Sequence, residues 1–188
     1  MFTGIIQAIA AVQKLERQRG SLVLTIQRPR SWKLAPGQSI ATNGVCLTVS
    51  KVGKNSYQAE LVGETLQRTT FGKAIPKRVN LERSLTLQSP LDGHLVLGHV
   101  DAVGKIIKIV RQRGNVLYYI SFPRQFSRLV ASKGSVAVDG VSLTVAAVRP
   151  SQFSVALVPF TLTRTTLAMR TGLKTGPYIG RGGPPGPP

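Results

Sequence analysis

The sequence predicts an all-β protein made of two tandem, similar six-stranded Greek-key β-barrels with short helices. The segment Gly44–Val49 returns 96 residues later as Gly140–Val145, with five of its six residues identical. The segment Thr65–Thr70 returns at the same spacing as Thr161–Thr166. Two matches at one spacing indicate a duplicated unit. Short strand-like segments separated by turn signals about every 8–12 residues favour small barrels, and the lack of alternating long helices argues against a parallel sheet.

The repeat predicts the domain boundaries. We expect an N-terminal barrel over residues 1–97 and a C-terminal barrel over 98–175. The last strand of the second barrel is expected to be atypical, because the counterpart of residues 78–82 would fall at 174–178, where the sequence differs. Residues 176–188 are rich in glycine and proline, and such a composition predicts a disordered tail.

Alternating apolar residues and turn signals predict the individual elements. Asn43-Gly44 and Asp139-Gly140 are typical of two-residue hairpin turns, since these residue types tolerate positive φ. Short helices are expected between Pro29 and Pro36, at 64–70 and at 126–131. Strands of the first unit are expected at 1–13, 22–26, 37–41, 45–52, 57–61 and 78–85, and those of the second at 100–110, 116–122, 135–138, 141–148 and 153–158.

Composition limits the function classes. Twenty-five basic and seven acidic residues give a net charge of +18, spread along the whole chain. This charge favours weak attraction to polyanions, but no basic cluster interleaved with aromatic residues predicts specific nucleic-acid recognition. No apolar run approaches the roughly 18 residues of a membrane span. One cysteine excludes an intrachain disulfide, and with two histidines it predicts no structural metal site. We expect a cytoplasmic protein.

The repeated strand predicts where a ligand would bind. Side chains alternate between the two faces of a strand, so Val45, Leu47 and Val49 share one face and Cys46 and Thr48 share the other. The second copy has the same pattern. A small barrel has room inside only for side chains. The apolar faces are therefore expected to fill the barrels, and a ligand site is expected between barrels.

Several residues on or near these strands are candidates for chemistry. Cys46 is either a nucleophile or a small buried residue, and Asp139 is either catalytic or only a turn residue. His94 and His99 are five residues apart and would point to opposite faces of one strand, so only one would serve a given site. His99 and Asp101 could share a face and orient a proton transfer, with a solvated histidine as the alternative.

Five motifs together resemble the riboflavin synthase family, over residues 1–167. They are Met1–Ile5, Asn43–Val49, Gly93–Asp101, Asp139–Val145 and Thr161–Thr166. The resemblance implies a cofactor-free dismutation, in which two molecules of 6,7-dimethyl-8-ribityllumazine exchange a four-carbon unit and give riboflavin and 5-amino-6-ribitylamino-uracil. It also implies a homotrimer, a site between the N-terminal barrel of one subunit and the C-terminal barrel of another, and an association with lumazine synthase.

The resemblance also implies site residues. On it, the catalytic groups are Cys46, His99, Asp139, Ser142 and Thr144. Further substrate contacts on the N-barrel side are Phe2, Thr3, Gly4, Ser39, Thr48, Gly63, Glu64, Thr65 and Thr69. Further substrate contacts on the C-barrel side are Lys133, Val158, Pro159, Thr161 and Thr165. The catalytic His99 is expected on this side too. Phe160 stands where this family usually has a glutamate, and no counterpart of the family's closing strand or C-terminal helix is expected after Leu173.

Two other functions are compatible with the sequence. The first is a non-catalytic lumazine- or flavin-binding protein that uses one barrel as a chromophore pocket. The second is a basic β-barrel that binds nucleic acid, which only the charge favours. Turnover of the lumazine separates the enzyme from the first alternative, and salt-sensitive RNA binding identifies the second.

Overall fold

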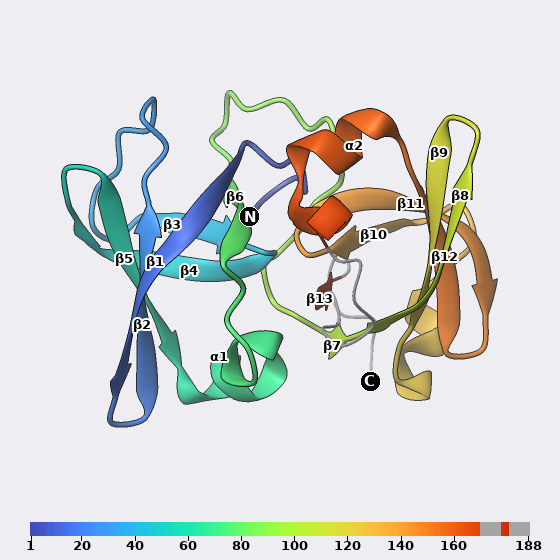
Figure 1. The fold of residues 1–188 in the computed structure, drawn as a ribbon, viewed down its shortest axis with the longest axis horizontal. Coiled ribbons are helices and arrows are strands. Elements are labelled where there is room, and N and C mark those ends of the chain that lie inside the picture. Colours follow the sequence, from blue (N-terminus) through green and yellow to red (C-terminus); the bar gives the residue numbers. More distant parts are fainter. Residues whose placement is uncertain (170–177, 181–188) are drawn as a thin grey trace.

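The computed structural model describes residues 1–169 and 178–180, which form two β-barrels side by side (Figure 1). The first barrel is closed, in the strand order β1-β2-β5-β4-β3-β6. All of its neighbouring strands are antiparallel. Its strands are β1 (Ala8–Gln18), β2 (Ser21–Gln27), β3 (Ser39–Thr42), β4 (Val45–Val52), β5 (Ser56–Val62) and β6 (Arg78–Arg83).

The second unit repeats this order in a seven-stranded sheet, β7-β13-β10-β11-β12-β9-β8. The strands β7 and β8 at the two ends of this sheet are separated along the chain only by Gly104, so the sheet returns on itself. Its strands are β7 (Ala102–Val103), β8 (Lys105–Gln112), β9 (Asn115–Ser121), β10 (Ser135–Val138), β11 (Val141–Arg149), β12 (Gln152–Leu157) and β13 (Tyr178–Gly180). The two predicted barrels are thereby confirmed.

The closing strand of the second barrel corrects two predictions. Tyr178–Gly180 lies within the segment expected to be disordered, and no closing strand was expected after Leu173. In the structure β13 pairs with β10 on one side and β7 on the other, as β6 pairs with β3 and β1 in the first barrel. Backbone hydrogen bonds do not require sequence similarity to Arg78–Arg83, so the repeat did not reveal this strand. The predicted tail residues 181–188 lie outside the described residues, as do 170–177.

Short helices connect the strands. Of the three helical segments that were expected, those at 64–70 and 126–131 are helical in the structure. α1 (Gly63–Arg68) and α2 (Pro159–Arg164) follow β5 and β12 at equivalent places, and each continues into a 3-10 turn, η1 (Thr70–Gly72) and η3 (Thr166–Met169). The 3-10 segment η2 (Arg124–Leu129) overlaps the helix expected at 126–131. The helix expected between Pro29 and Pro36 is wrong, since these residues form turns and irregular backbone. Proline and serine favour turns in such a short segment.

The alternation along the repeated strand is confirmed. Val45, Leu47 and Val49 are buried in the core of the first barrel, whereas Cys46 is half-buried and Thr48 is exposed. The second barrel has the same arrangement on β11 and its own separate core. The largest fully buried side chains include Tyr57, Phe71 and Phe153. Because only the apolar face of each repeated strand is buried in a core, its polar face points away from the barrel.

The two barrels meet through their repeated hairpin turns. Asn43 and Gly44 have φ of 48° and 81°, and Asp139 and Gly140 have 48° and 78°, as type I′ turns require. A β-carbon placed on Gly44 would lie 2.7 Å from the Gly140 nitrogen, and one placed on Gly140 would lie 2.6 Å from the Gly44 nitrogen. The turns thus lie back to back with their backbones in contact.

Asn80 of β6 links the two turns by hydrogen bonds. Its backbone N–H donates to Asn43 Oδ1 at 2.7 Å, and its Nδ2 donates to the Asp139 carbonyl at 2.9 Å. Its Oδ1 accepts from the backbone N–H of Thr166 at 2.7 Å. Asn80 is fully buried, where unpaired amide groups would cost free energy. Asn80 therefore fixes both turns and the start of η3 relative to one another, through its backbone to the first turn and through its side chain to the second turn and η3.

The glycine contact gives a stability prediction. Gly44→Ala should lower the free energy of unfolding by the strain of positive φ, about 1–2 kcal/mol, plus an overpacking cost of about 1–3 kcal/mol. Gly20→Ala is the matched control, since Gly20 has φ +83° and no atom within 4 Å of its added β-carbon. Urea unfolding measures both. An equal loss in the two variants would show that the contact between the turns contributes no stability.

Candidate functional site

A cavity of about 490 Å³ lies over the polar face of the repeated strand in the first barrel. Cys46 points to it from β4, and α1 forms one wall. The opposite wall is the chain that enters the second barrel, so the cavity lies between the barrels, as the alternation predicted. Its lining residues are Val45, Cys46, Glu64, Thr65, Arg68, Thr69, Gly98, His99, Val100, Asp101 and Phe126. Five predicted site residues (Cys46, Glu64, Thr65, Thr69 and His99) are thus brought together.

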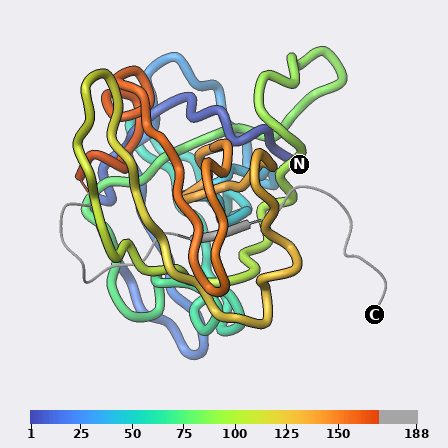
Figure 2. The backbone as a smooth tube through the Cα atoms, turned by 90° about the vertical axis from the view of Figure 1, so that its right-hand side faces the viewer, coloured from blue at the N-terminus to red at the C-terminus, as the bar shows by residue number. Residues whose placement is uncertain are grey.

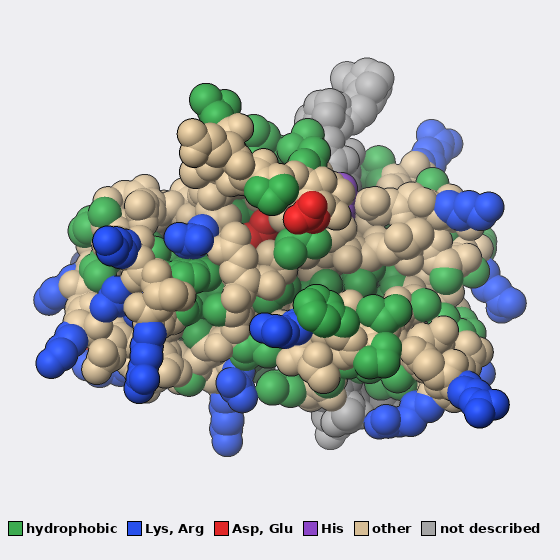
Figure 3. Space-filling model, turned by 90° about the horizontal axis from the view of Figure 1, so that it is seen from above, with side chains coloured by type: hydrophobic (Ala, Val, Ile, Leu, Met, Phe, Trp, Pro, Cys, Tyr) green, Lys and Arg blue, Asp and Glu red, His purple; other side chains and the backbone are tan. Residues whose placement is uncertain are grey.

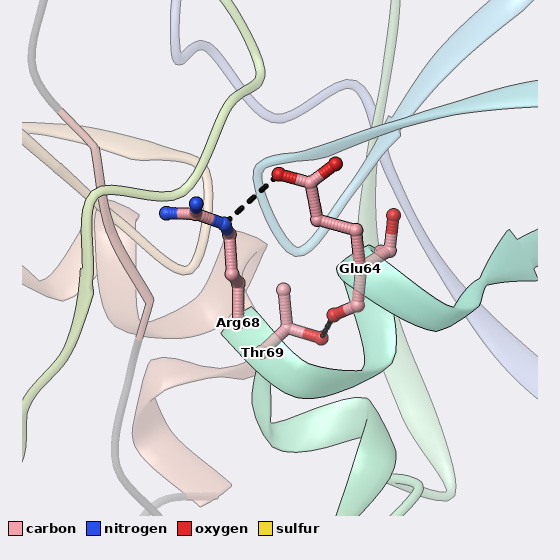
Figure 4. A network of polar contacts seen from close by, with 4 residues as sticks. Glu64, Arg68 and Thr69 are labelled. Atoms are coloured by element: carbon pink, nitrogen blue, oxygen red, sulfur yellow. Dashed lines mark hydrogen bonds and ion pairs between the residues drawn. The ribbon is translucent and has the colours of Figure 1, made fainter.

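The α1 wall is ordered by local polar contacts (Figure 4). Glu64 Oε1 accepts a hydrogen bond from Arg68 Nε at 3.0 Å, one helical turn away. Thr69 Oγ1 donates to the Thr65 carbonyl at 2.6 Å and ties the end of the helix to its first turn. The Glu64–Arg68 pair is exposed, so it contributes little to stability. Its charges remain available to a ligand in the cavity.

The second barrel repeats this wall with a different residue beside the arginine. Thr165 Oγ1 donates to the Thr161 carbonyl at 2.7 Å, as Thr69 does to Thr65. At the position of Glu64 stands Phe160, whose ring lies under the Arg164 guanidinium with 5.5 Å between Cζ and the ring centroid. A carboxylate–guanidinium pair in the first barrel is therefore a cation–π pair in the second.

The segment that leads into each barrel lies on the polar strand of the other barrel. The Cys46 N–H donates to the Gly98 carbonyl at 2.9 Å, and the Ser142 N–H donates to the Gly4 carbonyl at 2.8 Å. A β-carbon on Gly98 would meet Cys46 Cβ at 2.6 Å, and one on Gly4 would meet Ser142 Cβ at 2.7 Å. Only glycine permits these approaches at positive φ.

Glu82 holds the N-terminal segment on the second barrel. Its carboxylate accepts hydrogen bonds from the Thr3 N–H at 2.6 Å, from Thr3 Oγ1 at 2.7 Å and from the Gly4 N–H at 2.9 Å. Burial raises the pKa of this carboxyl, while the three donors act in the opposite direction. Glu82 is the buried anchor that places Gly4 against Ser142, and sequence reasoning did not select it, because it lies on a core strand.

Ser142 is paired with His94, a residue that the site prediction also missed. His94 Nδ1 and Ser142 Oγ are 2.7 Å apart. The backbone N–H of His94 donates to the Thr3 carbonyl at 3.0 Å, which fixes the histidine over β11. Burial lowers the pKa of His94, so the imidazole is neutral at pH 7 and one ring nitrogen can accept a proton. The five-residue spacing of His94 and His99 was the available signal, and the two do serve different strands.

The contacts of His99 and Gly4 do not follow the predicted division of site residues between the two barrels, whereas the roles of these residues toward a substrate stay predictions. His99 was expected on the C-barrel side but lines the cavity on Cys46. Thr3 and Gly4 were expected on the N-barrel side and do bond to Glu82 of the first barrel, but the Gly4 carbonyl also accepts from Ser142 of the second. Phe2 is fully buried in a small cluster between the barrels with Ala41, Val96 and Ala137. The cause is the exchange of leading segments, which the order of motifs along the chain does not reveal.

The remaining predicted residues lie outside the cavity on Cys46. Asp139 is fully buried in its turn, and Lys133 has φ of 64° in the turn before β10. Ser39 pairs with Thr48 at the far end of the β3–β4 hairpin, and Thr144 occupies the equivalent place on β11 opposite Ser135. Gly63 begins α1, and Val158, Pro159 and Thr161 form the exposed or half-exposed start of α2.

Residues 1–169 and 178–180 contain neither a metal-binding cluster nor a membrane-spanning helix. Among them, no three histidine, cysteine or acidic side chains are gathered so as to hold a metal ion. No helix in this part of the chain is long and apolar enough to cross a membrane.

The family was established by comparison with known proteins. The profile of the lumazine binding domain matches twice, at residues 3–84 and 97–175. The chain is 41% identical to riboflavin synthase of Photobacterium phosphoreum, over 89% of this chain and 78% of the relative. This chain belongs to the riboflavin synthase family. It is also 42% identical to the Mycobacterium bovis member over 89% of this chain and 86% of the relative, and 32% identical to the Bacillus subtilis member over 91% and 80%.

Solved structures confirm the family's two-barrel fold. LumP complexed with riboflavin superposes with a TM-score of 0.87, and LumP complexed with 6,7-dimethyl-8-(1′-D-ribityl) lumazine with 0.84. Each alignment covers 95% of this chain and 98% of LumP, at 19% and 18% identity respectively. At this identity the match concerns the fold alone. In this riboflavin synthase family member the first profile match spans the first barrel, and the second spans the second barrel except β13.

The buried His94 gives a pH prediction. Because its pKa is lowered in the folded state, the unfolded chain binds more protons at acidic pH, and stability falls as pH drops below about 6.5. The raised pKa of Glu82 has the opposite sign, since its contribution is present at low pH and lost as pH rises. Glu82 is present in both wild type and His94→Gln, so its effect is the same in the two and drops out of the comparison. The wild type should lose more stability than the variant between pH 7.5 and 5, measured by urea unfolding. Parallel profiles would contradict the prediction.

Proposed function

We propose that this protein is a transferase that converts two molecules of 6,7-dimethyl-8-ribityllumazine into riboflavin and 5-amino-6-ribitylamino-uracil without a cofactor. The observation that carries the proposal is the presence of similar polar surfaces on both repeats, each flanked by a leading segment and a threonine-bearing helix. A reaction between two copies of one substrate needs two such surfaces. Identity of 32–42% to riboflavin synthases over about nine-tenths of the chain supports the same conclusion.

The cavity on Cys46 suits an uncharged, hydroxyl-rich heterocycle. Its threonine hydroxyls and backbone groups can bind a ribityl chain and a pyrimidine edge. Its volume of about 490 Å³ falls within the range of small-molecule sites, roughly 300–1,000 Å³. We assign it to one lumazine, with Cys46 and His99 in contact with that molecule. Holding two rings in a reactive geometry can supply about 7–11 kcal/mol of the rate enhancement.

The His94–Ser142 pair is proposed to handle protons for the second lumazine. The reaction requires removal of a proton from an acidic ring methyl and addition to the partner ring. A neutral His94 that accepts from Ser142 Oγ raises the basicity of the hydroxyl oxygen, and His94 can then retain the proton. Nε2 of His94 is buried and has no hydrogen-bond partner among the described residues. In this assignment Ser142 touches the substrate, and His94 positions the Ser142 hydroxyl and accepts its proton.

The positions of the two helical walls favour a reaction between subunits. α1, beside the cavity on Cys46, lies at the bottom of Figure 1, and α2 lies at the top. Ligands beside these helices in one chain would be held apart, so two lumazines can react only if barrels of different chains face each other. We therefore propose that the protein acts as a homotrimer in the cytoplasm. We also propose an association with lumazine synthase, which would supply the substrate.

Turnover of the pure lumazine tests the proposal. We expect riboflavin fluorescence to appear with one riboflavin formed for every two lumazines consumed, and light scattering to give a mass above that of one 20.2 kDa chain. Ser142→Ala should lower kcat about 100-fold, as for loss of an acid–base group. Ser50→Ala, on the polar face of β4 but bonded to Gln58, is the control and should retain activity.

Three outcomes would contradict parts of the proposal. Lumazine binding by a monomer without riboflavin formation would indicate the non-catalytic binding protein. Full turnover by Cys46→Ser would remove Cys46 from any essential role. An unchanged kcat in Ser142→Ala would exclude the proton transfer assigned to the His94–Ser142 pair.

Phe160 gives a second functional prediction. Phe160→Glu recreates beside Arg164 the carboxylate that Glu64 provides beside Arg68. A charged hydrogen-bond acceptor contributes about 1.5–3 kcal/mol, so we expect KM for the lumazine to fall about tenfold. Thr163→Glu is the matched control, because it adds the same charge to an exposed position of α2. Equal effects of both changes would show that only the added charge matters.

A further inference from the structure

A second cavity, of about 400 Å³, opens at the top of the first barrel, away from the cavity on Cys46. It lies between the loop before β3 and the chain after β6, and the two cavities share no lining residue. The chain near residues 85–95 projects from the barrels beside it (Figure 2). We call it the upper pocket. Its lining residues are Lys33, Leu34, Gln38, Ser39, Ile40, Arg83, Ser84, Leu85, Thr86 and Ser89.

The upper pocket is positively charged. It contains Lys33 and Arg83 and no acidic residue. Seen from above, Lys and Arg side chains are plentiful around this face of the molecule and acidic ones are few (Figure 3). The net charge of +18 has no explanation in an uncharged lumazine. A pocket that gathers two cations without a carboxylate favours an anionic ligand.

Arg83 is held in position before any ligand binds. Its guanidinium lies over the buried Trp32 ring, with Cζ 5.2 Å from the centroid. Its Nε donates to Gln7 Oε1 at 3.3 Å, and the Arg83 backbone N–H donates to the same oxygen. Stacking and the Nε contact leave the two Nη groups to donate to a ligand. A planar, fixed guanidinium binds phosphate by two parallel hydrogen bonds.

Hydroxyl groups cover the other side of the pocket in an ordered loop. Thr86 Oγ1 and Ser89 Oγ are 2.9 Å apart, and the Thr86 N–H donates to Ser89 Oγ at 3.0 Å. Ser84 Oγ donates to the Ser39 carbonyl at 2.8 Å and joins the loop to β3. Hydroxyls can donate to phosphate oxygens or bind the polyol to which a phosphate is attached.

We propose that the upper pocket binds the phosphate monoester of a small polar molecule, such as a sugar phosphate. Lys33 and Arg83 bind the phosphate, and the Thr86–Ser89 loop contacts the hydroxyl-bearing part. The volume is near the lower end of the range for ligand sites, which fits a ligand of this size. The upper pocket shares no lining residue with the cavity on Cys46, and of the substrate contacts that the resemblance implies it contains Ser39 alone, so the proposal does not depend on the function proposed above.

Ribose 5-phosphate is the probe for this site. Calorimetric titration at fixed ionic strength should show binding of ribose 5-phosphate and none of ribose. Lys33→Gln and Arg83→Gln should each weaken binding about tenfold, since a hydrogen bond to a charged group contributes about 1.5–3 kcal/mol. Lys51→Gln, which removes one exposed charge from β4 outside the pocket, should bind as the wild type does.

Several results would overturn the proposal. They are absence of ribose 5-phosphate binding, equal binding of ribose, or equal weakening by Lys51→Gln, which would indicate the general charge of the surface. Competition by the lumazine would show that the pocket belongs to the substrate site. Lys33 is exposed, so its variant keeps the test valid if Arg83→Gln lowers the melting temperature. Riboflavin formation by both variants, measured in parallel, separates this result from the test of the enzyme.

Discussion

The close backbone contact between Gly44 and Gly140 is the constraint on which the arrangement of the two barrels depends. A β-carbon added to either glycine would lie less than 3 Å from the backbone nitrogen of the other, so neither glycine can carry a side chain. Asn80 then bonds to both turns from the core of the interface. Since each repeated strand begins immediately after its turn, Cys46 and Ser142 are held two residues from the contact. The spacing of the two polar surfaces follows from this contact and not from any flexible linker.

The exchange of leading segments makes each polar surface a product of both barrels. Gly98 covers Cys46 and Gly4 covers Ser142, and in each case a glycine is needed because the chain passes within van der Waals distance of the strand. Glu82 anchors the first of these segments through three hydrogen bonds in a buried position, where an unpaired carboxylate would be costly. Isolated barrels would lack one wall of each site.

The two copies have diverged on their polar surfaces. The first surface combines Cys46 with the Glu64–Arg68 pair, and the second combines Ser142 with a stacked Phe160–Arg164 pair. The strand cores beneath them keep the same alternation of buried valine and leucine. Packing restricts the inner face, where any change of volume is felt, whereas the outer face is free to differ. Two similar substrates can therefore be held in different chemical surroundings on one duplicated scaffold.

The amino-acid sequence by itself determined the duplication, the strand alternation and the hairpin turns, because these depend on local residue patterns. The resemblance to the riboflavin synthase family also implied that Cys46, Glu64, Thr65 and Thr69 share a site, and these four residues line one cavity. Tertiary structure alone decided which barrel receives Thr3, Gly4 and His99, that His94 meets Ser142, and that β13 closes the second barrel. These contacts join segments far apart along the chain, and no periodicity within either segment encodes its partner.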